Sequence, residues 1–123
     1  MTTTILTGAI FEATVTENPV VLVDFWAAWC APCRAFAPTF EAASAKHEGI
    51  VFGKVDTEAE RELAQAAHIS SIPTLMAFRD GIMVYSQPGA LRAADLDRLI
   101  AEVQGLDMDA IRTQLAAQQS ADV

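Results

Sequence analysis

Two cysteines, Cys30 and Cys33, are the residues of this sequence best suited to carry chemistry, and they are its only cysteines. They stand in the segment Trp29-Cys30-Ala31-Pro32-Cys33, with two residues between them. Thiols at this spacing can bond to each other or separate again, so the pair can exchange electrons with another disulfide. The spacing therefore predicts thiol–disulfide exchange.

Three other roles are compatible with a cysteine pair. A structural disulfide is one, although closing so short a loop removes little chain entropy. A zinc site is another, but it needs four ligands, and the only histidines, His47 and His68, lack the usual ligand spacing. Two ordinary core cysteines are the third. A lone close pair in a reducing compartment is more often catalytic or metal-binding than structural, and redox chemistry is favoured over the other roles.

The elements on either side would place this pair at the beginning of a helix. The apolar run over residues 20–27 predicts a central strand buried on both faces, and the residues from Cys30 onward predict a helix. A helix N-terminus has free N–H groups and about half a positive charge, which favour a thiolate. Cys30 is therefore expected to have the lowered pKa and to attack, whereas Cys33 is expected to be more buried and less ionised.

The remaining pattern alternates between strands and helices. Asp80-Gly81 is a strong turn signal between two strands. Further strands are expected over residues 2–6, 50–55, 74–78 and 83–86, and helices over 9–16, 58–67 and 93–103, with one more short helix after Asp107. This order predicts a mixed sheet covered by helices on both faces.

Composition limits the classes of protein to which the chain can belong. With 123 residues, 52% of them hydrophobic, it is expected to be one folded domain. A net charge of −8 makes a nucleic-acid partner improbable. No apolar run approaches the roughly 20 residues needed to cross a bilayer. Because no basic residue precedes Arg34, a secretory or mitochondrial leader is not expected, and the cytoplasm is the expected location.

The run over residues 23–33, Val-Asp-Phe-Trp-Ala-Ala-Trp-Cys-Ala-Pro-Cys, resembles the active-site strand and loop of the thioredoxin family. Further residues follow in the family's order and approximate spacing: Pro38, Lys54-Val55-Asp56, Ile69, Ile72-Pro73-Thr74, Phe78, Asp80-Gly81 and Gly89-Ala90. The chain departs from the family at Ala31, where glycine is usual, at Arg34, where lysine is usual, and at Ser71 and Pro88.

The resemblance implies an α/β protein with the thioredoxin fold, a central mixed β-sheet flanked by helices on both faces. The thioredoxin domain would cover residues 1–104. Residues 105–123 would then form a short C-terminal helical extension of the same domain, and residues 118–123 are expected to be a frayed tail.

The resemblance also implies roles for residues outside the cysteine motif. Asp24 would be a buried acid behind Cys33, with a pKa raised by desolvation, and would help to move the proton of Cys33. Lys54 would pair near this acid. The alternatives are a carboxylate at a strand end in contact with solvent and a solvated surface lysine. The Ile72–Pro73 bond would be cis, an isomer that sequence alone makes rare.

A small apolar rim around Cys30 would bind substrates. The Ile72 backbone would pair with an extended client segment in the manner of an added strand. Trp26 is expected to be a supporting core residue. The expected rim consists of Trp29, Ala31, Pro32, Ile72, Pro73, Gly89 and Ala90.

The function implied is that of a protein-disulfide reductase. Cys30 would attack a client disulfide and Cys33 would resolve the mixed disulfide, without a bound cofactor or metal. Electrons would come from NADPH through a flavoprotein, thioredoxin reductase, as part of electron transport and cell redox homeostasis. The protein would act as a monomer on disulfide-containing clients. Pro32 favours reduction, because oxidising relatives often have histidine there.

A binding module or holdase chaperone with the same fold is the rival interpretation. The segment after Gly105 gives it some support, because Met108, Ile111 and Leu115 form an apolar stripe at helical spacing. This stripe would be buried against the same molecule, against a partner or against a second copy. Such a module would need neither cysteine.

Overall fold

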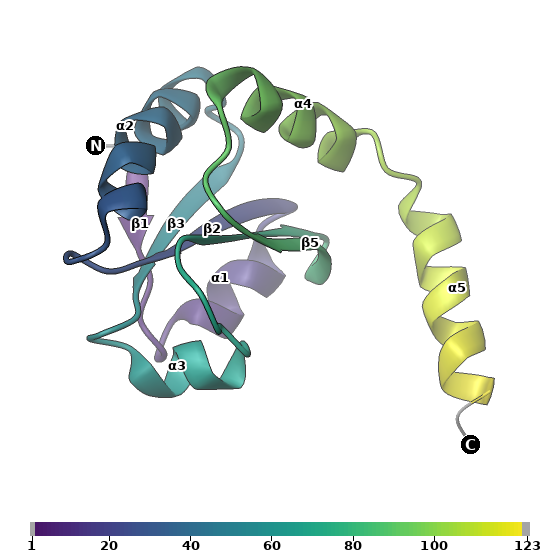
Figure 1. The fold of residues 1–123 in the computed structure, drawn as a ribbon. Coiled ribbons are helices and arrows are strands. Elements are labelled where there is room, and N and C mark those ends of the chain that lie inside the picture. Colours follow the sequence, from purple (N-terminus) through teal and green to yellow (C-terminus); the bar gives the residue numbers. More distant parts are fainter. Residues whose placement is uncertain (1, 122–123) are drawn as a thin grey trace.

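A computed structural model describes residues 2–121, in which strands and helices alternate as the sequence predicts (Figure 1). The elements are β1 (Thr3–Ile5), α1 (Phe11–Glu17), β2 (Val20–Trp26), α2 (Ala31–Lys46), β3 (Val51–Asp56), α3 (Arg61–Ala66), β4 (Thr74–Arg79), β5 (Ile82–Pro88), α4 (Ala93–Gln104) and α5 (Met108–Ala121). Helix α3 begins three residues later than expected, because the Asp56 carboxylate accepts the N–H groups of Glu58 and Ala59 in a turn.

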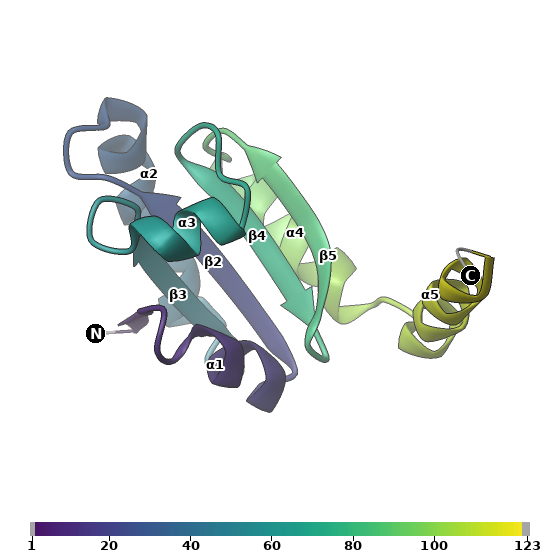
Figure 2. The same cartoon turned by 90° about the horizontal axis from the view of Figure 1, so that it is seen from below.

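The five strands form one mixed sheet in the order β1-β3-β2-β4-β5. Strands β1, β3 and β2 run parallel, while β4 is antiparallel to both β2 and β5. Helices α2 and α4 cover one face of the sheet, and α1 and α3 cover the other (Figures 1 and 2). The expected fold class is confirmed.

Strand β2 lies in the middle of the sheet and contributes to a hydrophobic core on each face. Successive side chains of a strand point to opposite faces. Val20 and Leu22 accordingly pack with residues of α2 and α4, whereas Val21 and Val23 pack with residues of α1. The prediction of a strand buried on both faces is confirmed. The even-numbered residues of β2 therefore face α2.

The turn between β4 and β5 is built as its sequence indicates. Asp80 and Gly81 both have positive φ, 53° and 78°. Two successive residues in this region match a turn whose twist suits an antiparallel hairpin, and glycine and aspartate tolerate it best.

Helix α5 is longer than the short helix expected, and it extends away from the rest of the molecule (Figures 1 and 2). Its helical conformation continues to Ala121, so residues 118–121 of the expected tail are helical. Alanine and glutamine, which dominate this stretch, are good helix formers. Asp122 and Val123 lie outside the described residues. Within residues 2–121, no helix has the length and apolar character needed to cross a membrane.

Candidate active site

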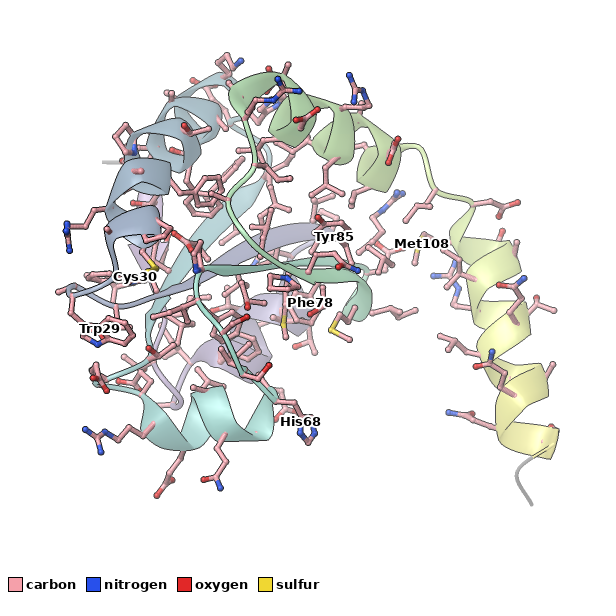
Figure 3. The ribbon with its side chains drawn as sticks, viewed as in Figure 1. Trp29, Cys30, His68, Phe78, Tyr85 and Met108 are labelled. Atoms are coloured by element: carbon pink, nitrogen blue, oxygen red, sulfur yellow. A yellow bond between two sulfur atoms is a disulfide. The ribbon has the colours of Figure 1, made fainter. Side chains whose placement is uncertain are left out.

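Cys30 and Cys33 form a disulfide at the beginning of α2, at the opposite end of the molecule from α5 (Figure 3). Their Cα atoms are 5.2 Å apart. Cys30 is the N-cap residue of the helix, with φ −89° and ψ 111°, and the Cys33 N–H group donates to the Cys30 sulfur at 3.2 Å. The predicted position of the pair at a helix N-terminus is confirmed.

Both sulfur-bearing side chains are almost fully buried in this oxidised form. Cys30 is 4% exposed and Cys33 2% exposed, and they pack with Ala27, Trp26 and Ile72. Cys33 is the more deeply buried of the two, as expected, but only by a small margin. Little of the Cys30 side chain is accessible from solvent, so the residues around it determine how another molecule can reach its sulfur.

The loop before β4 supplies one wall of the site. The Ile72–Pro73 bond is cis, as the resemblance implied. The Ile72 carbonyl oxygen lies 3.7 Å from the Cys30 sulfur. Pro73 is buried, and its carbonyl oxygen accepts the Gly89 N–H group at 2.8 Å. Residues far apart in the sequence are thus brought to one place, beside the disulfide.

The expected rim residues differ in how accessible they are. Trp29 is 67% exposed, which is unusual for so large an apolar ring. Ile72 is half-buried. Four further rim residues are exposed: Ala31, Pro32, Gly89 and Ala90. A client could therefore contact an apolar surface on both sides of the disulfide.

Asp24 is buried, 1% exposed, in the interior of β2, so the alternative of a solvent-contacting carboxylate at a strand end was wrong. Neither of its carboxylate oxygens has a hydrogen-bond partner among the described residues. Burial raises the pKa of Asp24 to about 6, and the positive charge of Lys54 opposes part of that rise. Because its side chain points to the α2 face of the sheet, it lies on the side of the sheet that carries Cys33.

Lys54 stands directly beside Asp24, because the two are paired in the parallel register of β2 and β3. Its ammonium group lies 4.9 Å from the centre of the Trp26 ring, at a distance that allows a cation–π interaction. Lys54 is half-buried rather than fully exposed. Trp26 is partly buried and packs against the two cysteines.

Two contacts of the active-site loop were not expected from the sequence. The Trp29 indole N–H donates to a Glu58 carboxylate oxygen at 3.0 Å, and the Arg34 guanidinium donates to the Ala28 carbonyl oxygen at 2.8 Å. No local pattern could have indicated either one. Glu58 reaches Trp29 only because β3 runs parallel to β2 and ends beside it.

A groove of about 510 Å³ also escaped the sequence analysis. It extends from Trp29 and Ile72 along one side of α3. Its remaining lining comes from Thr57, Arg61, Ala64, Gln65, Ile69, Ser70 and Ser71. Ile72, which packs against the disulfide, connects this groove to it. Among residues 2–121, no three His, Cys, Asp or Glu side chains are grouped so as to hold a metal ion.

Comparisons with known sequences agree with this geometry. The family model described as Thioredoxin matches residues 2–102. A Streptomyces coelicolor protein named putative thioredoxin 2 is 53% identical over 121 residues, covering 98% of this chain and 90% of the relative. Thioredoxin-1 of Saccharomyces cerevisiae is 35% identical over 94 residues, covering 76% of this chain and 91% of the relative.

Solved structures are similar over the same region. A mutant thioredoxin from Halobacterium salinarum superposes with a TM-score of 0.78 at 30% identity, covering 84% of this chain and 91% of the other. A thioredoxin from Plasmodium falciparum has a TM-score of 0.74 at 35% identity, covering 80% of this chain and 97% of the other.

Proposed function

The chain belongs to the thioredoxin family, and from that premise we propose how its residues reduce protein disulfides by dithiol–disulfide exchange. The observation that carries the proposal is the Cys30–Cys33 pair at the beginning of α2, with the Cys33 N–H group directed at the Cys30 sulfur. A reactive pair held at a helix N-terminus is the arrangement that thiolate chemistry requires.

The first step uses the reduced pair. The Cys30 thiolate is stabilised by the Cys33 N–H group and by the positive end of α2. It attacks one sulfur of a client disulfide, so that a bond forms between Cys30 and the client while the client's own S–S bond breaks. The second client sulfur leaves as a thiolate and takes a proton from solvent.

The second step releases the client. Cys33 gives its proton to the Asp24 carboxylate, directly or through a water molecule, and the resulting thiolate attacks the Cys30 sulfur. The Cys30–Cys33 bond forms as the Cys30–client bond breaks, and the client sulfur leaves as a thiolate that takes up a proton. Two electrons have then passed to the client. The pKa of Asp24, about 6, suits a base that works near neutral pH. Lys54 holds a positive charge beside this carboxylate.

Client binding is assigned to the surface around Cys30. Trp29, Ala31 and Pro32 would contact the client on the helix side, and Gly89 and Ala90 on the other. The Ile72 backbone would pair with an extended client segment, with Pro73 holding that loop in place. The position of the Ile72 carbonyl oxygen beside the Cys30 sulfur supports this role.

Regeneration needs an external source of two electrons and two protons. We assign this to NADPH acting through a flavoprotein, thioredoxin reductase, and we place the cycle in the cytoplasm, where thiols are kept reduced. The protein would thereby serve electron transport and cell redox homeostasis.

Reduction of a model protein disulfide in the presence of a small dithiol tests the proposal. Wild type is expected to accelerate the reaction strongly, and Cys30→Ser to give only the rate of the dithiol alone. Equal and negligible rates for both proteins would refute the enzyme and leave the binding module or holdase chaperone.

The order of attack is tested by trapping. Cys33→Ser is expected to accumulate covalent mixed disulfides with clients, because Cys30 attacks but nothing resolves the intermediate. Cys30→Ser is the matched control and should trap far less. Equal trapping by the two variants would contradict the assigned roles.

A further inference from the structure

Helix α5 exposes an apolar stripe of its own. Met108 is buried, but Ile111, one turn further along, is only half-buried and Leu115 is 38% exposed. Met108 lies where the helix leaves the body of the molecule, and the later turns extend away from it (Figure 3). Two large apolar side chains on one face of this helix therefore lack adequate cover within a single chain.

The outer turns of α5 are poor in charge. Residues 113–121 contain no charged side chain, whereas 20% of the whole chain is charged. Charged residues are depleted at the centre of protein–protein interfaces, and a solvated helix normally carries them. Moreover, isolated helices of this length are only marginally stable in water, so the outer turns of α5 need a packing partner.

The first turn of α5 fixes the direction in which the helix leaves the body. The Asp107 carboxylate caps it by accepting the Ala110 N–H group at 3.1 Å. The Arg112 guanidinium reaches Asp80, in the β4–β5 turn, at 3.4 Å. These contacts and the buried Met108 side chain hold the first turn of α5 against the body of the molecule. Beyond this turn, α5 extends away from the body, and residues 112–120 are exposed (Figures 1 and 2).

The body of the same chain offers a matching surface, which we call the α1–α3 groove. It has a volume of about 540 Å³ and lies between α1 and α3. Met76 and Phe78 of β4 line it together with Leu63, and Met83, 54% exposed, stands at its border. Glu12 is the one charged residue in its lining.

The groove and the helix adjoin. Gly81 lines the α1–α3 groove, and it directly follows Asp80, which Arg112 of α5 contacts. One continuous surface of the chain thus carries both a projecting apolar helix and an apolar groove. A two-fold interface requires this combination, because each copy must present both complementary parts.

We propose that two copies of this chain associate by exchanging α5, so that Ile111 and Leu115 of each copy enter the α1–α3 groove of the other. The functional unit of the redox cycle stays one chain, since the disulfide lies at the opposite end and remains open to clients (Figure 3). The assembly nevertheless departs from the monomer expected from the sequence. Because each copy carries a net charge of −8, added salt strengthens the dimer by screening repulsion outside the nearly uncharged contact.

The mass of the full-length protein in solution, measured by sedimentation or light scattering across a dilution series, tests this assembly. Wild type should give twice the mass of one chain, and Leu115→Asp should weaken association by about 100-fold or more, since it places a charge in an apolar contact. Ala117→Asp, which adds the same charge to the opposite face of α5, is the matched control and should remain dimeric. A wild-type monomer at all concentrations and salt levels would overturn the proposal.

A mixing experiment distinguishes exchange between copies from any contact within one chain. Leu115→Asp alone and Met83→Lys alone should each be monomeric, but an equimolar mixture should form a one-to-one heterodimer. In that heterodimer the Leu115→Asp helix enters the groove that carries Met83→Lys, so the two introduced charges pair. The other helix and groove keep their wild-type residues. Failure of the mixture to associate would contradict the exchange. All variants should reduce a model protein disulfide at the wild-type rate, so a failed assembly is distinguishable from a failed redox function.

Discussion

The disulfide end and the α5 end of the molecule differ in how many parts of the chain hold each in place. The disulfide is surrounded by the end of β2, the first turn of α2 and the Ile72 loop, and its side chains are almost fully buried. Beyond its first turn, α5 has no comparable surroundings within one chain, and Leu115 is exposed. The reactive disulfide is held where several segments of the chain meet. The surface available for assembly lies on a helix that few other segments contact.

The difference has an energetic consequence. Side chains at the disulfide end and in the adjoining cores are fixed by close packing, so that a change in side-chain volume there is costly. The outer turns of α5 depend on contacts that form only when a second copy is present. Substitutions in the two regions should therefore differ in how much stability they remove. They should also differ in whether that loss depends on protein concentration.

The largest difference in stability is expected when one leucine in each region is replaced by alanine. Leu96→Ala removes a side chain that is 0% exposed between α4 and the sheet, and should lower the free energy of unfolding by about 2–5 kcal/mol. Leu115→Ala, measured at a dilution at which the chains are separate, should cost less than about 0.5 kcal/mol. Urea unfolding of both variants checks the comparison, and equal losses would show that α5 is packed within its own chain.

A smaller effect, with a defined pH dependence, is expected at Asp24. The folded-state pKa of about 6 lies above the ordinary value of 3.8, so the folded protein retains a proton that the unfolded chain has lost. Stability should therefore decrease as the pH rises from about 4 to 6 and stay lower above that range, by about 3 kcal/mol in total. Asp24→Asn removes this cost, and should be more stable than wild type by about that amount at pH 8 and similar to it at pH 4.

Chemical denaturation at the two pH values measures this difference. Glu102→Gln, which neutralises an exposed carboxylate of α4, serves as the control and should change stability little at either pH. If Asp24→Asn gained the same stability at pH 4 and pH 8, ionisation of the Asp24 carboxyl group would not destabilise the folded protein.

The smallest effect is expected at the border of the active site. Glu58→Ala removes the acceptor of the Trp29 indole N–H group, an exposed hydrogen bond worth about 0.5–1 kcal/mol. The Trp29 ring should become less ordered, so that KM for a model protein disulfide rises a few-fold while kcat is retained. Glu62→Ala, on the exposed side of α3, is the control. An unchanged KM would show that the orientation of Trp29 is set by packing alone.

Local patterns predicted most of the secondary structure. The apolar run of β2, the helical spacing of Leu96, Leu99 and Ile100, and the turn at Asp80-Gly81 each reflect interactions between residues close in sequence. The predicted helix boundaries were displaced where a side chain competes with the helix, as at Asp56, whose carboxylate delays the beginning of α3. The final residues of α5 were expected to fray, although the alanine and glutamine residues there are good helix formers.

The sequence by itself determined the reactive pair and the helix terminus that activates it, because Cys30, Pro32 and Cys33 act through bonds formed within a few residues. Only the tertiary structure decided that Ile72 lies beside Cys30, that Lys54 stands beside Asp24, and that α5 leaves its apolar face uncovered. The reason is physical. Contacts between distant segments depend on the register of the sheet and on which surfaces remain free once its two faces are packed, and no short stretch of sequence encodes either.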